Sequence, residues 1–328
     1  MPFKLYVNPV SHLKINRIIV LFYLIIFNTN NCEKVLNNIS KKETAELNEV
    51  EIDWQLNDFK QNDPTLIKVL RDYYISYPTE LSRKITPYRL NPKHIYGQFR
   101  QADVVDKYYS GLKYGGFFIE AGAYDGETLS NTLFLEVKRN WTGVLIEPNP
   151  DNYKILQSLN RNSSSIETCL SRRREPEVVD FDAASIFGGI IVNGRPKPGE
   201  SIPITDRDRI QKIVQKTRRT IKMQCFPLTS IVNALGNPVI DYLSLDIEGA
   251  ELDVLKTIPF DELNIQLMSL EIIRKKLNLN VPGDHIDQYD DIVNFLEEKG
   301  YKVLKSIPHT QEHLSFEVFF EKVKCKSV

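Results

Sequence analysis

The C-terminal two-thirds of the sequence alternates short runs of β-forming residues with amphipathic stretches. The β-forming runs predict strands at residues 117–121, 143–147, 165–170, 240–246, 265–272, 301–306 and 314–321. Apolar residues three and four apart predict helices at residues 130–139, 151–160, 251–258 and 289–299. This alternation predicts an α/β fold with a seven-stranded, mostly parallel sheet. The last two strands follow each other directly, so we expect the last one to run antiparallel.

An unbroken apolar run lies near the N-terminus. Residues 18–27 (IIVLFYLIIF) follow Lys4, Lys14 and Arg17 and precede a polar stretch. A basic segment before an apolar run of this length is typical of a secretory signal peptide. Ten helical residues rise only about 15 Å, against about 30 Å of bilayer hydrocarbon. A cleaved signal peptide fits this length best. A retained, tilted anchor is the alternative, because the residues after the run are not the small ones that usually mark a cleavage site.

The charge asymmetry around this run sends the rest of the chain into the lumen of the secretory pathway. We therefore expect a protein of the endoplasmic reticulum or Golgi, either membrane-anchored through residues 18–27 or secreted. We assign residues 1–31 to the signal peptide or signal anchor, 32–85 to a stem and helical lead-in, and 86–328 to the folded domain. Within that domain, residues 172–219 break the strand–helix alternation and are interpreted as an insertion over the open face.

Charge and cysteine spacing exclude two classes of partner. Lys and Arg number 42 against 43 Asp and Glu, a net charge of -1, so we expect no nucleic-acid partner. None of the four cysteines has Cys-x-x-Cys spacing, so a lumenal location favours disulfides over metal ligands, with the pairing left open. His309 and His313, between the last two strands, are candidates for a base or a weak metal pair, although loop histidines are usually neither. We predict no metal site. Three glycosylation sequons are usable only in the lumen, namely Asn38-Ile39-Ser40, Asn140-Trp141-Thr142 and Asn162-Ser163-Ser164.

A glycine-containing turn follows the first predicted strand of the domain. Residues 117–126 read FFIEAGAYDG, which is an apolar strand ending in Glu120-x-Gly122-x-x-x-Gly126. Glycines allow such a turn to approach a ligand closely. A nicotinamide-binding turn would have a different glycine spacing. A carboxylate at the strand end suits a cofactor that carries positive amino and sulfonium groups. The alternative is an ordinary strand–turn–helix in which the glycines only make the turn tight.

Carboxylates also end three further predicted strands. Glu147 lies 27 residues after Glu120, near the offset expected for a residue that binds ribose hydroxyls in a bidentate manner, although a Glu before Pro is also common in turns. Asp246 and Glu248 follow the strand at 240–246, where ligands bind in open α/β sheets. They would also favour the N-terminus of the following helix electrostatically. Glu271 ends the next strand and is a candidate base toward a substrate hydroxyl.

Five segments together resemble the FkbM-type methyltransferase domain (Methyltransferase 21), and more closely its arthropod Star-like branch. They are FFIEAGAYDGETLSNTLFLE, NWTGVLIEPNP, ETCLS, QCFPLTSIV and DYLSLDIEGAELDVLKTIP, within residues 96–322. The resemblance implies a Rossmann-like class I fold that uses S-adenosylmethionine to methylate a hydroxyl oxygen. It implies cofactor contacts at Glu120, Gly122, Asp125, Gly126, Glu147 and Asp246. If the domain is an enzyme, we expect Glu248 or Glu271 to act in catalysis by orienting the substrate hydroxyl for attack on the methyl group.

The Star-like branch implies a different activity. Its namesake is a membrane protein of the secretory pathway that assists transport of a growth-factor precursor from endoplasmic reticulum to Golgi. The partner would then be a secretory client protein rather than a hydroxyl-bearing substrate. Within the resemblance, the ETCLS and QCFPL segments contain Cys169 and Cys225, for which we predict a disulfide.

Overall fold

The computed structural model describes residues 55–79, 97–192, 218–276, 285–308 and 315–323. The apolar run at 18–27 and the two loop histidines, His309 and His313, lie outside these ranges. Among the helices of the described ranges, none is long and apolar enough to cross a membrane.

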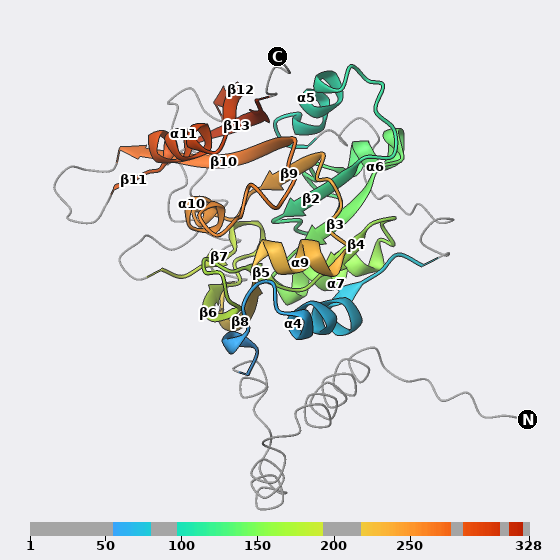
Figure 1. Cartoon of the computed structure of the whole chain (residues 1–328), viewed down its shortest axis with the longest axis vertical. Coiled ribbons are helices and arrows are strands. Elements are labelled where there is room, and N and C mark those ends of the chain that lie inside the picture. The colour runs from blue at the N-terminus through green and yellow to red at the C-terminus, as the bar shows by residue number, and fades with distance from the viewer. Residues whose placement is uncertain (1–54, 80–96, 193–217, 277–284, 309–314, 324–328) are drawn as a thin grey trace, which may run out of the picture.

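Nine strands form the main sheet, in the order β1-β4-β3-β2-β9-β10-β13-β12, with β11 paired to β10 (Figure 1). Strands β4, β3, β2, β9 and β10 are parallel, and β13 runs antiparallel between β10 and β12. The strands are β1 (Ile75–Ser76), β2 (Phe117–Ala121), β3 (Thr142–Ile146), β4 (Ser164–Ile166), β9 (Tyr242–Leu245), β10 (Leu267–Lys276), β11 (His285–Asp287), β12 (Tyr301–Pro308) and β13 (Ser315–Lys322). The predicted α/β class and the antiparallel last strand are confirmed, and β1 and β11 are additions to the seven expected strands.

A second sheet has the order β5-β8-β6-β7. Its strands are β5 (Cys169–Leu170), β6 (Glu177–Asp182), β7 (Gly189–Ile190) and β8 (Thr220–Phe226), with the short helix η4 (Ser185–Phe187) between β6 and β7. The single strand predicted at 165–170 is wrong, because the chain leaves the main sheet after Ile166 and joins the second sheet at Cys169. The Thr168 hydroxyl donates to the Gln224 carbonyl oxygen at 2.6 Å, which fixes this change of sheet.

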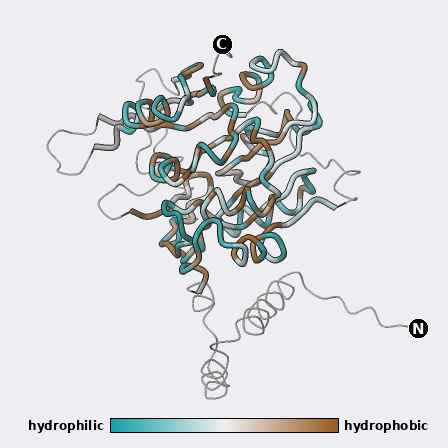
Figure 2. Tube along the Cα trace, in the orientation of Figure 1, coloured by the Kyte–Doolittle hydropathy of each residue, from teal (hydrophilic) through white to brown (hydrophobic). Residues whose placement is uncertain are grey.

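Helices cover both faces of the main sheet, and alternate strand residues point to each. On β2, Ile119 joins the larger core and Phe118 the smaller one. The larger core packs against η1 (Gln55–Asp58), α4 (Pro64–Val69), η2 (Leu70–Tyr74), α9 (Leu228–Ala234), α10 (Glu251–Leu255) and α11 (Tyr289–Glu298). The smaller core packs against α5 (Gln101–Tyr108), α6 (Leu133–Arg139) and α7 (Pro150–Ser158). Figure 2 shows hydrophobic residues concentrated along the central strands.

The lead-in before position 86 contributes to the larger core. Leu66 and Leu70 are fully buried in it, and Ile75 of β1 pairs with Ile166 at the edge of the main sheet. The Arg71 guanidinium donates to the carbonyl oxygen of Ala234 at the end of α9 at 2.9 Å. Residues 64–76 are therefore packed as part of the same body as the predicted domain.

Candidate functional site

A cleft with about 610 Å³ of open space, part of it continuous with solvent, lies at the carboxyl ends of β2, β3 and β9. Three turns of the main sheet line it, through Gly122, Glu147 and residues 246–248. The opposite wall belongs to the second sheet and includes Leu170, Phe181, Ile186 and Ile190. Carboxyl ends of parallel strands are the usual position of ligands in open α/β sheets.

Gly122 is required by the close contact between two of these turns. It has φ +87°, and a Cβ at this position would lie 1.9 Å from the carbonyl oxygen of Asp246. Only glycine combines this φ with this approach. Gly126, also at positive φ, packs against Leu156 of α7 and is not among the residues that line the cleft. The tight turn thus holds the ends of β2 and β9 together.

Glu147 is buried at the edge of the cleft, and protein donors occupy most of its carboxylate. One oxygen accepts the backbone N–H of Tyr124 at 2.7 Å. The other accepts the N–H of Asn149 at 2.9 Å and the side-chain amide of Asn152 at 3.2 Å. Of about four acceptor positions on a carboxylate, one therefore stays open, on the oxygen bound to Tyr124. Burial raises the pKa of Glu147 to about 7, against the lowering effect of these three donors.

Glu120 and Asp125 bind the turn itself and do not line the cleft. Glu120 accepts the Ser130 hydroxyl at 2.9 Å, the Asn131 N–H at 2.7 Å and the Thr132 hydroxyl at 2.5 Å. Burial raises the pKa of Glu120, while the charge of Arg161 opposes that rise. Asp125 accepts the backbone N–H groups of residues 127 and 128. The role of Glu120 and Asp125 as cofactor contacts stays a prediction. In the structure, their hydrogen bonds stabilise the turn from beneath.

A buried ion pair completes this support. The side chains of Arg161 and Glu136 are 1% and 3% exposed and lie 3.0 Å apart. Arg161 also donates to the Gly126 carbonyl oxygen and to the Thr132 hydroxyl. Glu136 accepts from Asn162 and Ser163 at the start of the chain segment leading into β4. One guanidinium thus connects the turn after β2 with α6 and β4.

Three carboxylates meet beyond β9. One carboxylate oxygen each of Asp246, Glu248 and Glu271 lies within 4.8 Å of the other two, which is close enough for a single metal ion to bind all three. Asp246 and Glu248 line the cleft. Burial and the charge of Glu271 raise the pKa values of Asp246 and Glu248 well above their ordinary range. Burial raises the pKa of Glu271 to about 7, and its hydrogen bond with Asp246 opposes that rise. This group can hold shared protons or a cation. From the sequence, no metal site was predicted.

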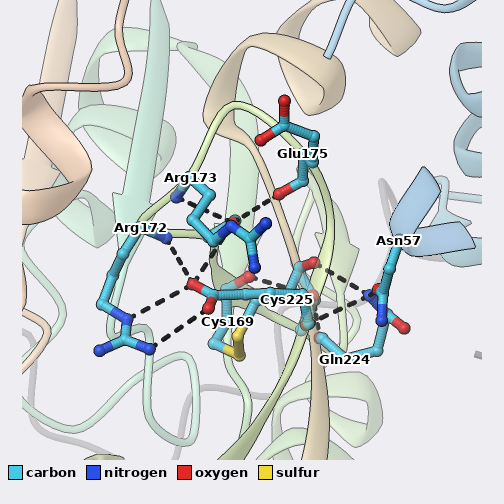
Figure 3. Close-up of a disulfide and its surroundings, with 10 residues drawn as sticks. Asn57, Cys169, Arg172, Arg173, Glu175, Gln224 and Cys225 are labelled. Atoms are coloured by element: carbon cyan, nitrogen blue, oxygen red, sulfur yellow. Dashed lines mark hydrogen bonds and ion pairs between the residues drawn. A yellow bond between two sulfur atoms is a disulfide. The ribbon is translucent and has the colours of Figure 1, made fainter. Parts of the chain in front are cut away.

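The structure contains the disulfide that the resemblance implied. Cys169 of β5 and Cys225 of β8 are direct cross-strand neighbours with a Cα–Cα distance of 4.4 Å (Figure 3). Beside it, Gln224 donates to Asn57 and Arg172 binds Glu177. Arg172 to Arg174 lie in a bend before β6.

Several cleft residues were not predicted from the sequence. They are Tyr124, Asn152, Thr168, Phe181, Ser185 and Ile190. Asn152 bridges Glu147 and the Ser185 carbonyl oxygen, at 3.2 and 3.1 Å. Its position in the first turn of the helix after Glu-Pro was an available signal. The residues of the second sheet carried no such signal, because only the pairing of β6 with β8 brings them to the cleft.

The strand order with β13 inserted antiparallel, together with a cleft at the carboxyl ends of β2, β3 and β9, defines the class I S-adenosylmethionine-dependent methyltransferase fold. The model of the "Methyltransferase FkbM domain" family matches residues 120–303, more than half of the 328 residues. The chain belongs to this family. Among curated proteins, none matches the sequence.

Solved structures similar to this chain are methyltransferases of low identity. Methyltransferase FkbM from Methylobacillus flagellatus KT shares 14% identity with a TM-score of 0.39, and the match covers 78% of this chain but only 53% of that one. A methyltransferase from Pyrococcus furiosus shares 14% identity, covering 72% and 88%, with a TM-score of 0.34. A 1,6-didemethyltoxoflavin-N1-methyltransferase from Burkholderia thailandensis, solved with S-adenosylhomocysteine, shares 9% identity, covering 68% and 77%, with a TM-score of 0.34.

Proposed function

We propose that this chain binds S-adenosylmethionine in the cleft and methylates a hydroxyl oxygen of an acceptor that enters beside Asp246. The observation that carries the proposal is that Glu147, an acceptor for ribose hydroxyls, and Asp246 directly follow two strands of one sheet and line one cleft. Glu248 also lines this cleft, and Glu271, in the middle of β10 and not at a strand end as predicted, has a carboxylate oxygen within 4.8 Å of both Asp246 and Glu248. Strands β3 and β9 are separated by β2, which puts these two sites about 10 Å apart.

The residues of the cleft fit this cofactor. The open acceptor position on Glu147 suits one ribose hydroxyl, in place of the bidentate contact expected from the sequence. The apolar side chains of Leu170, Phe181 and Ile190 suit a flat heteroaromatic base. Asp246 lines the cleft, and its carboxyl oxygen can accept a hydrogen bond from the amino group of the cofactor. When bound, the cofactor supplies an electrophilic methyl group on a sulfonium.

Glu271 is the base in this proposal. A base that works near neutral pH needs a pKa close to 7, and burial raises the pKa of Glu271 to about 7. Asp246, whose pKa is raised well above its ordinary range, keeps the proton of the hydrogen bond that the two residues share. Glu271 can therefore take the proton from the hydroxyl group of the methylated substrate, while Glu248 orients that hydroxyl.

The test is transfer of a labelled methyl group from S-adenosylmethionine to a hydroxyl-bearing secreted glycoprotein fraction. We expect transfer by the wild type, a loss of about 10²- to 10⁴-fold in Glu271→Gln, and full transfer by Glu297→Gln, a matched change at an exposed position on α11. Cofactor binding without transfer to any acceptor would reject catalysis. It would favour the second candidate, a Star-like module that binds a client protein in transit from endoplasmic reticulum to Golgi.

Both candidates place the protein in the lumen of the secretory pathway. The buried Cys169–Cys225 disulfide supports this location, because such bonds persist in oxidising compartments. Asn140 of the second sequon is exposed after α6 and available to the glycosylation machinery. Expression in secretory cells should give a glycan shift that endoglycosidase removes and that Asn140→Gln reduces by one glycan, since Asn38 and Asn162 carry the other two sequons. An unglycosylated product with free Cys169 and Cys225 would contradict the location.

A further inference from the structure

We infer that the Cys169–Cys225 disulfide positions the second-sheet wall of the cleft, so that ligand binding and reduction of this disulfide are coupled. The inference rests on the proposed cofactor site. It assigns a role in binding to a bond that the sequence marks only as a structural crosslink.

Cys169 belongs to the cleft and to the crosslink at once. It lines the cleft between Thr168 and Leu170, which also line it. Its strand, β5, is only two residues long and pairs with β8 through Cys169 opposite Cys225 and Leu170 opposite Phe226. Two paired residues form a marginal strand. The disulfide is therefore the covalent part of the connection between this wall and the rest of the second sheet.

The disulfide also contacts both sides of the cleft through a small apolar core. This core contains Cys169 and Cys225 together with Phe181 and Ile190, which are two of the apolar side chains of the wall. Ala250 belongs to the same core and Ile247 packs against it. Both come from the turn after β9 that carries Asp246 and Glu248. A shift of the sulfur atoms would thus be transmitted to the wall and to the acidic turn.

Access to the disulfide depends on the same cleft. Cys169 is 5% exposed and Cys225 is fully buried. A reductant must therefore approach from the cleft or wait for local opening. In the reaction, a dithiol such as dithiothreitol gives up two electrons and two protons. The Cys169–Cys225 bond breaks to two thiols, and the reductant closes its own disulfide.

Linkage makes the expected effect reciprocal. If reduction weakens ligand affinity by a given factor, saturating ligand must shift the dithiol–disulfide equilibrium toward the oxidised form by the same factor. Coupling between sites is typically about 5- to 150-fold, and we expect about tenfold here.

The experiment uses the full chain and S-adenosylhomocysteine as the probe. Its dissociation constant is measured by calorimetry for the oxidised and the reduced protein, with circular dichroism showing that both are folded. The fraction of reduced Cys169–Cys225 is then measured in a fixed dithiothreitol redox buffer with and without the probe. Two variants serve as controls: Cys32→Ser/Cys325→Ser keeps the disulfide, and Cys169→Ala/Cys225→Val replaces it by apolar side chains.

We expect weaker binding on reduction, an equal factor in the redox titration, and reductant-insensitive weak binding in Cys169→Ala/Cys225→Val. Equal affinity of the folded oxidised and reduced proteins would overturn the inference while leaving the proposed function intact. If the oxidised protein does not bind the probe, the proposed function fails. Hydrogen exchange at the amides of Phe181, Ile190 and Ile247 then decides the inference, since unchanged exchange on reduction would show that the disulfide does not position the wall.

Discussion

Two groups of carboxylates in this protein, one buried and one half-buried, differ in what surrounds them. Glu120 and Glu136 lie around one guanidinium, that of Arg161, and accept hydrogen bonds from hydroxyl and backbone donors. The carboxylate oxygens of Asp246, Glu248 and Glu271 lie within 4.8 Å of one another, and burial, together with the charges of neighbouring carboxylates, raises the pKa values of all three residues.

This difference distinguishes carboxylates that stabilise the fold from carboxylates that can take part in catalysis. A buried carboxylate with a cation and several donors holds the chain in place. Carboxylates that face one another at a cleft exchange protons near neutral pH or accept a cation, which is the behaviour that catalysis requires. Glu120 and Asp246 appear equivalent in the sequence, because each lies at the end of a predicted strand. In the structure they belong to different groups.

The largest expected effect tests the supporting group. Arg161→Met leaves Glu120 and Glu136 buried without their cation, and removing one partner of a buried pair costs about 3–5 kcal/mol. Lys302→Met, which breaks the exposed pair with Glu321, should cost less than about 1 kcal/mol. Both are measured as free energies of unfolding in urea. Equal losses in the two variants would show that Arg161 does not support the turn.

The next effect concerns the contact that joins the two turns. Gly122→Ala adds a Cβ against the Asp246 carbonyl oxygen at a positive φ, and we expect a loss of about 2–4 kcal/mol. Gly236→Ala has a similar φ, +89°, and nothing within 4 Å of the added Cβ. It should lose only about 1 kcal/mol from backbone strain. Thermal unfolding compares the two, and similar losses would mean that the contact with Asp246 is not constraining.

The smallest effect tests the cleft group through pH. The pKa of Glu271 is raised from an ordinary value of 4.5 to about 7, so the folded state binds more protons than the unfolded state between these values. Its contribution to stability is present below about pH 4.5 and is lost as pH rises through about 7. Glu271→Gln should therefore be more stable than the wild type by about 1–2 kcal/mol at pH 8.

That gain should disappear near pH 4, where Glu271 is protonated in both states of the wild type. Urea unfolding at pH 4 and pH 8 gives the comparison, with the exposed Glu297→Gln expected to show no pH-dependent difference. A Glu271→Gln variant that is less stable than the wild type at pH 8 would show that Glu271 belongs to the supporting group instead.

Much of the fold followed from local pattern, because the hydrophobic strands and the glycine turns are local features. The insertion of β13 between β10 and β12 is not local, and it places Glu317 directly opposite Glu271. The predicted strand at 165–170 failed because the change of sheet at Thr168 depends on Gln224, 56 residues away. For the same reason, the cleft wall of β6 and β7 could not be predicted from residues 177–190 alone.

The same distinction between local features and long-range contacts applies to the candidate site. The ends of β3 and β9 were predicted correctly as positions near a cleft, since Glu147 and Asp246 directly follow apolar strands. Whether a carboxylate at such a position points into the cleft or beneath the turn depends on its partners. For Glu120 these partners are Ser130 to Thr132, which the sequence places ten or more residues later.

The most direct test of the account is a calorimetric titration of S-adenosylmethionine into Glu147→Gln and Glu120→Gln. A glutamine at 120 can still accept the Asn131 N–H through its amide oxygen, whereas both carboxylate oxygens of Glu147 accept N–H groups, so one of those donors would face the amide nitrogen of a glutamine. We predict micromolar binding by the wild type, a similar affinity for Glu120→Gln and loss of binding in Glu147→Gln. Loss of binding in Glu120→Gln with retained binding in Glu147→Gln would contradict the assignment of Glu120 to the structural support and of Glu147 to the cofactor site.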